Sequence, residues 1–385
     1  MIVDVTSYPV IDDHCHPCPY SREKRPFWRC FNSTLFEQRE EDAKSTILLH
    51  LVTNELRAFM KMDADATMDE VIAERDRRYK ENPAGWLNAL AKDANVEQVI
   101  ADITYPVTAW YSKKFITESE LNEYYDEVET YTIRKEIRFE YIYDPIIPQK
   151  LPFAEFLQHY YDAMEDVVKE EKPVSFKSII GYVTGLDVVK HTYQEGEIAY
   201  YRYLQDPTDF ANEKVLRDFM LYDSMKLCKK YNLPLALHTG SGNTPMCRIR
   251  RMNPTLLHDF LADEENRTVP TILLHCGYPY LREMGYLCSH FTQVYTDVSQ
   301  MVYHAGLCAE TGIKELLETC PFTKLMFASD GGGIPEHIWY SAKYFKQALS
   351  RTLSDYVELN VFDVATAEKY ARMILSENAR RLYKL

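Results

Sequence analysis

Short apolar runs alternate with longer helical stretches along most of this chain, and this alternation restricts its fold more than any other feature. Eight runs read as strands, and they cover residues 2–17, 98–104, 137–143, 174–180, 233–238, 271–275, 293–298 and 324–329. Strands separated by helices pair in parallel through right-handed crossovers. Eight such units predict an α/β fold, a (β/α)8 TIM barrel, with an open doubly wound sheet as the alternative.

A long helical segment lies between the first and second predicted strands. Residues 35–61 and 68–92 are dense in Glu, Lys, Arg, Leu and Ala, which favours helices. An excursion of this kind typically forms a cap, so we expect a helical cap insertion at about residues 20–95. The Tyr-rich and charged stretch 181–212 is expected to be a smaller insertion. Residues 1–385 are otherwise predicted to form a single barrel domain.

Composition and charge exclude several classes of protein. The chain has 385 residues, is 46% hydrophobic and carries a formal net charge of -14, which argues against a nucleic-acid-binding surface. No uncharged apolar run reaches the length of about 18 residues that a membrane span requires, and no signal peptide is apparent. Nine scattered cysteines are typical of a reducing compartment. We therefore expect a cytoplasmic protein that acts on a small molecule, and a homo-oligomer is compatible with this.

Polar residues terminate or interrupt many of the predicted strands. Alternation along a strand places His14 and His16 on one side and Cys15 on the other. The later strands add four more polar residues, which are Lys177, His238, His275 and Asp330. Each of them alone is often a structural residue or, at Asp330-Gly331, a turn signal. In a barrel, however, the carboxy-terminal ends of all strands meet at one rim, and six buried polar groups there predict a metal centre.

Lys177 has two interpretations. A cation in a barrel strand is costly to bury, and an ordinary ion pair at the rim would satisfy it. Carboxylation of its amine by carbon dioxide would instead produce an anion that can bridge two divalent ions. The sequence alone leaves both open.

The order and spacing of these residues resemble the amidohydrolase superfamily. More narrowly, the segments 176–186, 238–242, 253–257, 274–279, 295–299 and 377–383 are similar to its amidohydrolase-related branch (amidohydrolase 2). That branch includes the nodulin-like domains fused to glutamine synthetase. The similarity runs from the first strand to the C-terminus and is weakest in the helical excursion. It implies a distorted (β/α)8 barrel with one or two divalent metal ions at its rim.

The resemblance also implies how the metal ligands are divided. His14, His16 and Asp330 would bind the more buried ion, His238 and His275 the second, and carboxylated Lys177 would bridge them. Without carboxylation, a mononuclear site of His14, His16, His238 and Asp330 would remain, with His275 orienting water or substrate. Imidazole and carboxylate ligands suit Zn²⁺, with Mn²⁺ as the alternative.

The activity implied is metal-dependent hydrolysis of a C–N bond. A metal-activated hydroxide would attack an amide-type carbonyl, and Asp330 would act as general acid and base. A γ-glutamyl or other anionic substrate is expected by analogy with the glutamine-synthetase-linked relatives. A metal-dependent decarboxylase or a sugar-acid isomerase on the same rim is the alternative, and a non-catalytic regulatory or scaffold barrel is a third interpretation.

Candidate substrate contacts are Arg138, Glu140, Tyr182 and Arg248. Arg138 and Glu140 would form a carboxylate clamp and its support, or else an internal salt bridge. Arg248 belongs to a basic group, with Arg250 and Arg251, that would attract an anion or simply lie in solvent. Other aromatic residues proposed to line the pocket, or merely to pack, are Trp28, Tyr105 and His337. Relatives commonly show Arg where this chain has Val183, so the identity of the substrate does not transfer.

Overall fold

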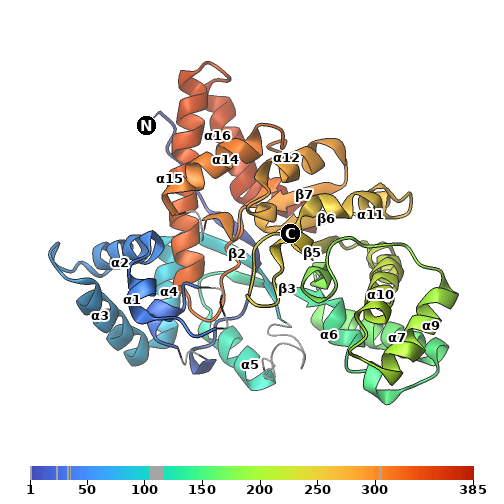
Figure 1. The fold of residues 1–385 in the computed structure, drawn as a ribbon. Helices are drawn as coiled ribbons and strands as arrows, with labels where there is room; N and C mark the ends of the chain where they lie inside the picture. Colours follow the sequence, from blue (N-terminus) through green and yellow to red (C-terminus); the bar gives the residue numbers. More distant parts are fainter. Residues whose placement is uncertain (1, 23–24, 33, 35, 104–116, 303–305) are drawn as a thin grey trace.

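The computed structural model describes residues 2–22, 25–32, 34, 36–103, 117–302 and 306–385. Eight strands form one sheet in the order β1 to β8, and each neighbouring pair is parallel (Figure 1). The strands are β1 Val10–Cys15, β2 Val96–Asp102, β3 Thr132–Arg138, β4 Ser175–Ser178, β5 Leu235–His238, β6 Thr271–Leu274, β7 Val294–Asp297 and β8 Leu325–Met326. The predicted (β/α)8 architecture is confirmed, because an open doubly wound sheet would reverse its strand order.

Backbone hydrogen bonds join β1 to the segment that follows β8. The N–H of Asp13 donates to the carbonyl of Phe327, and the N–H of Asp330 donates to the carbonyl of His14, each over 2.9 Å. The N–H of His16 donates to the carbonyl of Gly331 over 2.6 Å. These bonds nearly close the barrel, and they bring Asp330 beside the histidines of β1 from the opposite end of the chain.

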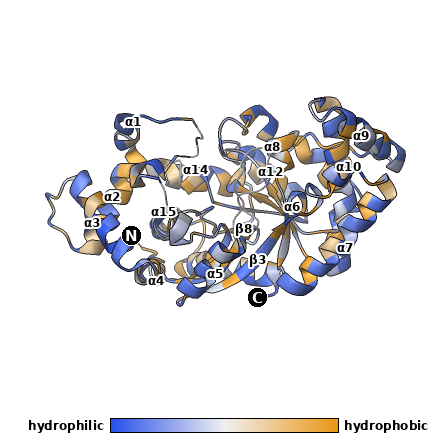
Figure 2. Cartoon of the chain, turned by 90° about the horizontal axis from the view of Figure 1, so that it is seen from below, coloured by the Kyte–Doolittle hydropathy of each residue, from blue (hydrophilic) through white to orange (hydrophobic). Residues whose placement is uncertain are grey.

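Apolar side chains fill the barrel below the rim. A buried cluster combines residues of five strands with two from the last helix, namely Ile11, Ile100, Ala236, Ile272, Leu274, Met326, Ala379 and Tyr383. In Figure 2 the central strands are coloured mainly as hydrophobic, whereas the outer helices carry residues of both kinds. The polar residues at the strand ends therefore lie above a packed apolar floor.

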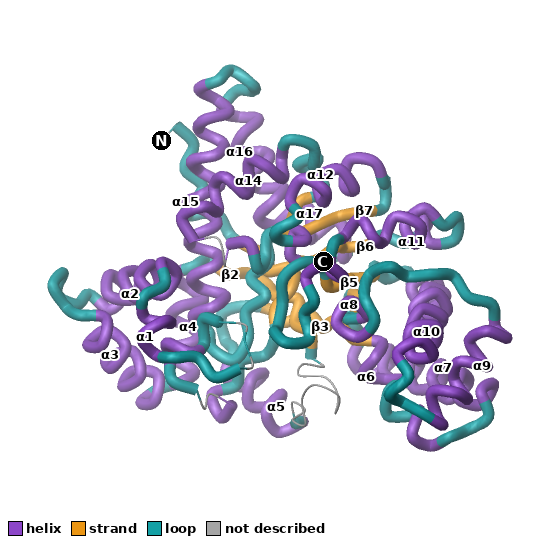
Figure 3. The backbone as a smooth tube through the Cα atoms, in the orientation of Figure 1, coloured by secondary structure: helices purple, strands orange, loops and turns teal. Residues whose placement is uncertain are grey.

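Helices surround the sheet on all sides (Figure 3). They are α1 Glu40–Lys44, α2 Ile47–Met60, α3 Met68–Glu81, α4 Pro83–Asp93, α5 Glu118–Glu127, α6 Phe139–Tyr143, α7 Phe153–Glu171, α8 Ile180–Val183, α9 Tyr193–Gln205, α10 Phe210–Tyr231, α11 His258–Ala262, α12 Leu281–His290, α14 Ala309–Leu317, α15 Glu336–Glu358, α16 Val364–Arg372 and α17 Asn378–Tyr383. The segment between β1 and β2 contains α1 to α4, as its composition predicted, and these helices lie together on one side of the barrel (Figure 1). Within the described residues, no helix has both the length and the apolar character needed to cross a bilayer.

The third strand differs from its predicted position, residues 137–143. The strand begins at Thr132 and ends at Arg138, and the aromatic run after it forms α6. Charged residues such as Arg134 and Lys135 disguise the strand, because only its last three residues are buried. The following segment is helical because Phe139 and Tyr143, four residues apart, bury the same helix face.

The first strand is shorter than the predicted range 2–17. The backbone N–H groups of Val3 and Val5 donate to the hydroxyls of Ser354 and Ser350 on α15, not to a neighbouring strand. These N-terminal residues therefore pack against a helix, and β1 begins only at Val10. The predicted second strand also ended at Thr104, which lies outside the described residues.

Candidate metal centre at the barrel rim

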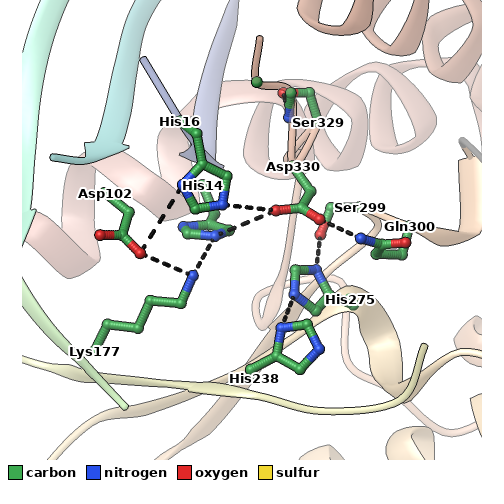
Figure 4. A network of polar contacts seen from close by, with 12 residues as sticks. His14, His16, Asp102, Lys177, His238, His275, Ser299, Gln300, Ser329 and Asp330 are labelled. Carbon is green, nitrogen blue, oxygen red and sulfur yellow. Dashed lines mark hydrogen bonds and ion pairs between the residues drawn. The ribbon is translucent and has the colours of Figure 1, made fainter. Parts of the chain in front are cut away.

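The six predicted metal-site residues all lie at or just beyond the carboxy-terminal ends of strands. His14 belongs to β1, Lys177 to β4 and His238 to β5. His16 and His275 follow β1 and β6 directly, and Asp330 lies in the loop after β8. Figure 4 shows them in two neighbouring sets of polar contacts, one around Asp330 and one around His275. The structure thus brings together residues that are distant in sequence, as the strand order predicted.

Asp330 lies between the two histidines of β1. Its Oδ1 is 3.5 Å from Nε2 of His14 and 3.3 Å from Nε2 of His16. Its Oδ2 accepts a hydrogen bond from the side-chain amide of Gln300, which follows β7. The backbone of Asp330 is left-handed, with φ of 51°, a conformation that non-glycine residues rarely adopt. This turn directs the carboxylate back over β1.

The glycines after Asp330 allow this close approach. A Cβ atom on Gly332 would lie 2.8 Å from the Cβ of His16, well inside van der Waals contact. The backbone of the β8 loop can therefore pass against β1 only because position 332 has no side chain. Cys15, between the two histidines, belongs to the hydrophobic core that the strands share with the surrounding helices.

Lys177 forms a buried ion pair and does not reach open solvent. Its Nζ lies 3.2 Å from Oδ2 of Asp102, the last residue of β2, and 2.6 Å from Nε2 of His14. Asp102 also accepts hydrogen bonds from Arg138, the last residue of β3. Carboxylation of Lys177 stays a prediction.

A buried carboxylate contacts the Nδ1 atom of His14. Its Nδ1 lies 3.0 Å from Oε1 of Glu136 on β3, and both side chains are completely buried. A carboxylate against Nδ1 leaves Nε2 as the nitrogen that faces Lys177 and Asp330. This is the usual orientation of a metal-binding histidine supported by an acidic residue.

His238 and His275 form a separate hydrogen-bonded chain. Nε2 of His275 lies 2.8 Å from Nδ1 of His238, and Nδ1 of His275 lies 2.7 Å from the hydroxyl of Ser299. Nε2 of His238 lies 3.0 Å from the carbonyl of Ser241. Ser299 in turn donates to Asp297 at the end of β7. Each ring nitrogen of the two histidines therefore already faces a polar neighbour.

The electrostatics of the two histidine pairs differ. Burial and the charge of Lys177 lower the pKa of His14, but Glu136 and Asp330 raise it, and the result is about 9. Burial lowers the pKa of His16 to about 4. Burial also holds the pKa values of His238 and His275 well below the usual range. The surroundings of His14 thus favour a positive charge, and those of His238 and His275 disfavour one.

The donor set fits a divalent metal ion. Among the described residues, two groups of three side chains each offer one ligand atom per residue, with these atoms within 4.8 Å of one another. They are His14 with His275 and Asp330, and His14 with His16 and Asp102. Imidazole nitrogens and carboxylate oxygens in such a cluster are suited to zinc or manganese. Both groups share His14, so the most complete set of donors surrounds the end of β1.

The predicted substrate contacts occupy different environments. Arg138 is buried against Asp102. Glu140 accepts hydrogen bonds from the hydroxyl of Ser178 and the N–H of Ile179. These contacts differ from the predicted Arg138–Glu140 salt bridge. The Tyr182 ring lies 4.3 Å from the ring of His238. Arg248 is exposed in the loop after β5.

The other residues proposed to line the pocket are Trp28, Tyr105 and His337. Trp28 is half-buried, and Nε2 of His337 lies 3.0 Å from the carbonyl of Cys30. Tyr105 lies outside the described residues.

Several residues of the network were not predicted from the sequence, namely Asp102, Glu136, Asp297, Ser299 and Gln300. Asp102 and Asp297 end their strands, as His238 does, so the same signal was available. Glu136 gave no signal, because β3 was assigned too late in the chain. Gln300 has a left-handed backbone, with φ of 56°, and this conformation could not be predicted from the sequence pattern.

The architecture defines an α/β barrel with a polar, histidine-rich rim, and comparisons with known proteins agree with it. Residues 201–385 match the family model described as amidohydrolase. The chain is 26% identical to the protein fluG of Emericella nidulans, over 99% of this chain and 46% of that protein. The chain therefore spans less than half the length of this curated relative.

Two solved structures share the fold over nearly their whole length. A protein from Lactobacillus casei, provisionally described as a metal-dependent hydrolase, superposes with a TM-score of 0.81 and 23% identity, covering 99% of this chain and 98% of that one. The uronate isomerase of Thermotoga maritima gives a TM-score of 0.70 at 15% identity, covering 98% and 95%. The resemblance to amidohydrolases that the sequence predicted is confirmed.

Proposed function

We propose that this chain is a metal-dependent hydrolase of the amidohydrolase superfamily that cleaves a C–N bond in a small anionic substrate. One observation carries the proposal most directly: Oδ1 of Asp330 lies within 3.5 Å of Nε2 of both His14 and His16 at the mouth of the barrel. A carboxylate in this position can both hold a metal ion and accept a proton. We also propose that residues 1–385 act as one barrel domain, with α1 to α4 as its cap.

The metal ion would be held by His14, His16 and Asp330. Zn²⁺ suits these ligands best, and Mn²⁺ is the alternative. Such an ion supplies Lewis-acid polarisation of a substrate carbonyl and lowers the pKa of a water molecule. A carboxylated Lys177 would bridge two ions, whereas a Lys177 that stays paired with Asp102 would leave a site for one.

The side chains of the rim then divide the proton transfers. Asp330 takes a proton from the attacking water as the C–O bond forms, and returns it to the departing nitrogen as the C–N bond breaks. Gln300 donates to Oδ2 of Asp330 and so leaves Oδ1 directed at the histidines. The His275–His238 pair provides neutral imidazoles that orient the water or the substrate carbonyl, because burial keeps both pKa values low.

An anionic substrate, such as a γ-glutamyl amide, fits the loop after β5. Arg248 and Arg250 are exposed there, whereas Arg251 lies over the ring of Phe210 at 4.5 Å. Tyr182, whose ring is tilted against that of His238, would form one wall of the binding site. All nine cysteines are free thiols, which agrees with a cytoplasmic enzyme.

Sugar-acid isomerisation is the second candidate. The contact between Lys177 and Asp102 bears on it, because a lysine that stays unmodified in this ion pair would leave no carbamate to bridge two ions. The fold shared with a uronate isomerase permits this reaction without selecting it. The two reactions are distinguishable by their products, since only the hydrolysis releases an amine.

The test begins with metal-free protein that is reloaded with Zn²⁺ or Mn²⁺. Release of amine from a panel of amides that includes γ-glutamyl amides is measured beside the conversion of uronates. We expect amine release that requires metal and falls about 100- to 10,000-fold in Asp330→Asn. The matched control is Glu140→Gln, which alters a buried carboxylate at the same rim without contact to His14 or His16. Full activity of Asp330→Asn, or uronate conversion without amine release, would overturn the hydrolytic assignment.

A further inference from the structure

A buried ion pair joins the cap to the first residue of α15. Nε and Nη2 of Arg75, on α3, donate to Oε1 and Oε2 of Glu336 over 2.6 and 2.9 Å. The indole N–H of Trp86, on α4, donates to the same Oε1 over 2.7 Å. Arg75 is 1% exposed, and Glu336 is completely buried. A guanidinium that binds both oxygens of a carboxylate fixes its orientation as well as its distance, so the cap determines how α15 begins.

The loop that carries Asp330 lies between the start of α15 and β1. A Cβ atom at position 331 would lie 2.7 Å from Cγ1 of Ile338, on the first turn of α15. One at position 332 would lie 2.8 Å from Cβ of His16. Both distances are shorter than van der Waals contact, so the glycine backbone fills the space between the helix and the strand. A shift of the first turn of α15 would therefore change the position of Asp330 relative to β1.

His337, the second residue of α15, forms a parallel connection. Its Nδ1 lies 2.8 Å from the carbonyl oxygen of Gly332, and its Nε2 lies 3.0 Å from that of Cys30. Its ring also packs edge-on against Phe31, with the ring centres 5.0 Å apart. The first turn of α15 thus contacts both the Asp330 loop and the residues that lead from β1 into the cap.

We infer that Glu336 is a positioning residue for Asp330. Its bonds to the cap fix the first turn of α15, and this turn holds the Asp330 loop against the histidines of β1. The inference rests on the place of Asp330 in the metal site of the proposed function, but not on the reaction proposed there. It predicts that removal of the Arg75 side chain disturbs the Asp330 loop and the metal site, although Arg75 belongs to the cap. An ion pair that only stabilised the fold would change neither.

The experiment measures hydrogen exchange of residues 329–335 by mass spectrometry in metal-free, full-length protein, well below the unfolding temperature of each variant. Arg75→Met is compared with the wild type and with Arg217→Met, which removes the guanidinium of another buried ion pair, with Asp144, on α10. Figure 1 shows α10 on the opposite side of the barrel from α3. We expect exchange in this segment to become roughly 10-fold faster in Arg75→Met and to stay unchanged in Arg217→Met, since only the first variant loses the charge-assisted bonds that hold α15.

Metal binding provides the second readout. Zn²⁺ affinity, measured by competition with a chromophoric chelator and without substrate, is expected to fall about 10-fold in Arg75→Met, the lower end of the usual cost of losing an outer partner of a metal ligand. The Co²⁺ absorption spectrum should also change, because Asp330 would meet the ion in a different geometry, whereas a fold that is merely less stable keeps the wild-type spectrum. Glu336→Gln, which keeps the shape of the side chain, should behave in the same way. If the two residues act as one unit, the double variant binds Zn²⁺ within about 3-fold of either single variant.

Unchanged exchange and an unchanged Co²⁺ spectrum in Arg75→Met and Glu336→Gln would overturn the inference and show an ion pair that only stabilises the fold. Equally fast exchange of residues 329–335 in Arg217→Met would overturn it too, because any loss of stability would then open the loop. Failure of the wild type to bind Zn²⁺ would refute the metal site of the proposed function, while faster exchange in Arg75→Met would still support the coupling of cap and loop. Zn²⁺ binding without amine release would refute only the reaction.

Discussion

The two sides of the barrel rim hold two histidines each but differ in what those histidines can do. On the β1–β8 side, His14 and His16 direct Nε2 towards one carboxylate, Asp330. On the β5–β6 side, His238 and His275 are hydrogen-bonded to each other and to Ser241 and Ser299. The first pair converges on Asp330, beside His14, whose surroundings favour a positive charge, whereas every ring nitrogen of the second pair faces another polar atom.

Neighbouring charges explain the difference. Glu136 and Asp330 raise the pKa of His14 to about 9 against burial and the charge of Lys177. The β5–β6 side has no comparable acid on a ring nitrogen among the described residues, because Asp297 contacts Ser299 and the backbone of His275. The β1–β8 side is therefore expected to bind the metal ion, and the β5–β6 side to orient the reacting groups.

Loss of a ligand on each side should separate these roles most clearly. His14→Asn is expected to weaken Zn²⁺ binding about 100- to 1,000-fold, which is roughly one ligand's share of the binding free energy of a zinc site. His275→Asn is expected to keep Zn²⁺ affinity within about 10-fold of the wild type while turnover falls strongly. Equilibrium dialysis with metal analysis measures the first effect, and steady-state kinetics the second.

Equal losses of Zn²⁺ in both variants would contradict the division. They would show that His275 is a full ligand and that its bond to His238 is replaced by metal. The unfolding temperature of each variant serves as the control, since a misfolded rim would lose metal for an unrelated reason.

The comparison also shows how far the sequence could predict the site. Apolar runs indicated every strand except β3 at its observed position, although β1 is much shorter than predicted. The residues at or beyond the ends of these strands included His14, His238 and Asp330, so the strand pattern was enough to assemble the rim. Glu136 could not be predicted, because its strand carries charged residues on the surface and reads as a loop. The partner of Lys177 could not be predicted either, because Asp102 and Lys177 meet only through the order of strands β2 to β4.

Removal of the Glu136 carboxylate, which contacts Nδ1 of His14, should change the Zn²⁺ affinity of the β1–β8 side. Glu136→Gln is expected to lower Zn²⁺ affinity about 10- to 100-fold, the usual cost of losing the residue that orients a metal-binding histidine. Glu140→Gln is the matched control, because Glu140 is equally buried but bonds Ser178 and Ile179. A loss of Zn²⁺ in the control as large as in Glu136→Gln would mean that burial of charge, not contact with His14, sets the affinity.

The pH dependence of metal binding should also report the β1–β8 side. With a pKa of about 9, His14 holds a proton at neutral pH that a metal ion must displace. Zn²⁺ affinity is therefore expected to rise by up to about 10-fold per pH unit between pH 7 and 9 and to level off above it. His238 and His275 contribute no slope there, because burial keeps their pKa values low and both are already neutral. A flat profile over this range would contradict the charge assigned to His14.

Two serines offer the mildest test of the comparison. The hydroxyl of Ser299 lies 2.7 Å from Nδ1 of His275, and the hydroxyl of Ser329 donates to Asp12, which ties β1 to β8. Because each substitution removes about one hydrogen bond, effects of roughly 5-fold are expected. Ser299→Ala should lower turnover without changing Zn²⁺ affinity, whereas Ser329→Ala should lower Zn²⁺ affinity by loosening the loop that carries Asp330. The same titration and kinetics measure both variants. If Ser299→Ala lowered Zn²⁺ affinity and Ser329→Ala lowered only turnover, the β5–β6 side would hold the metal ion.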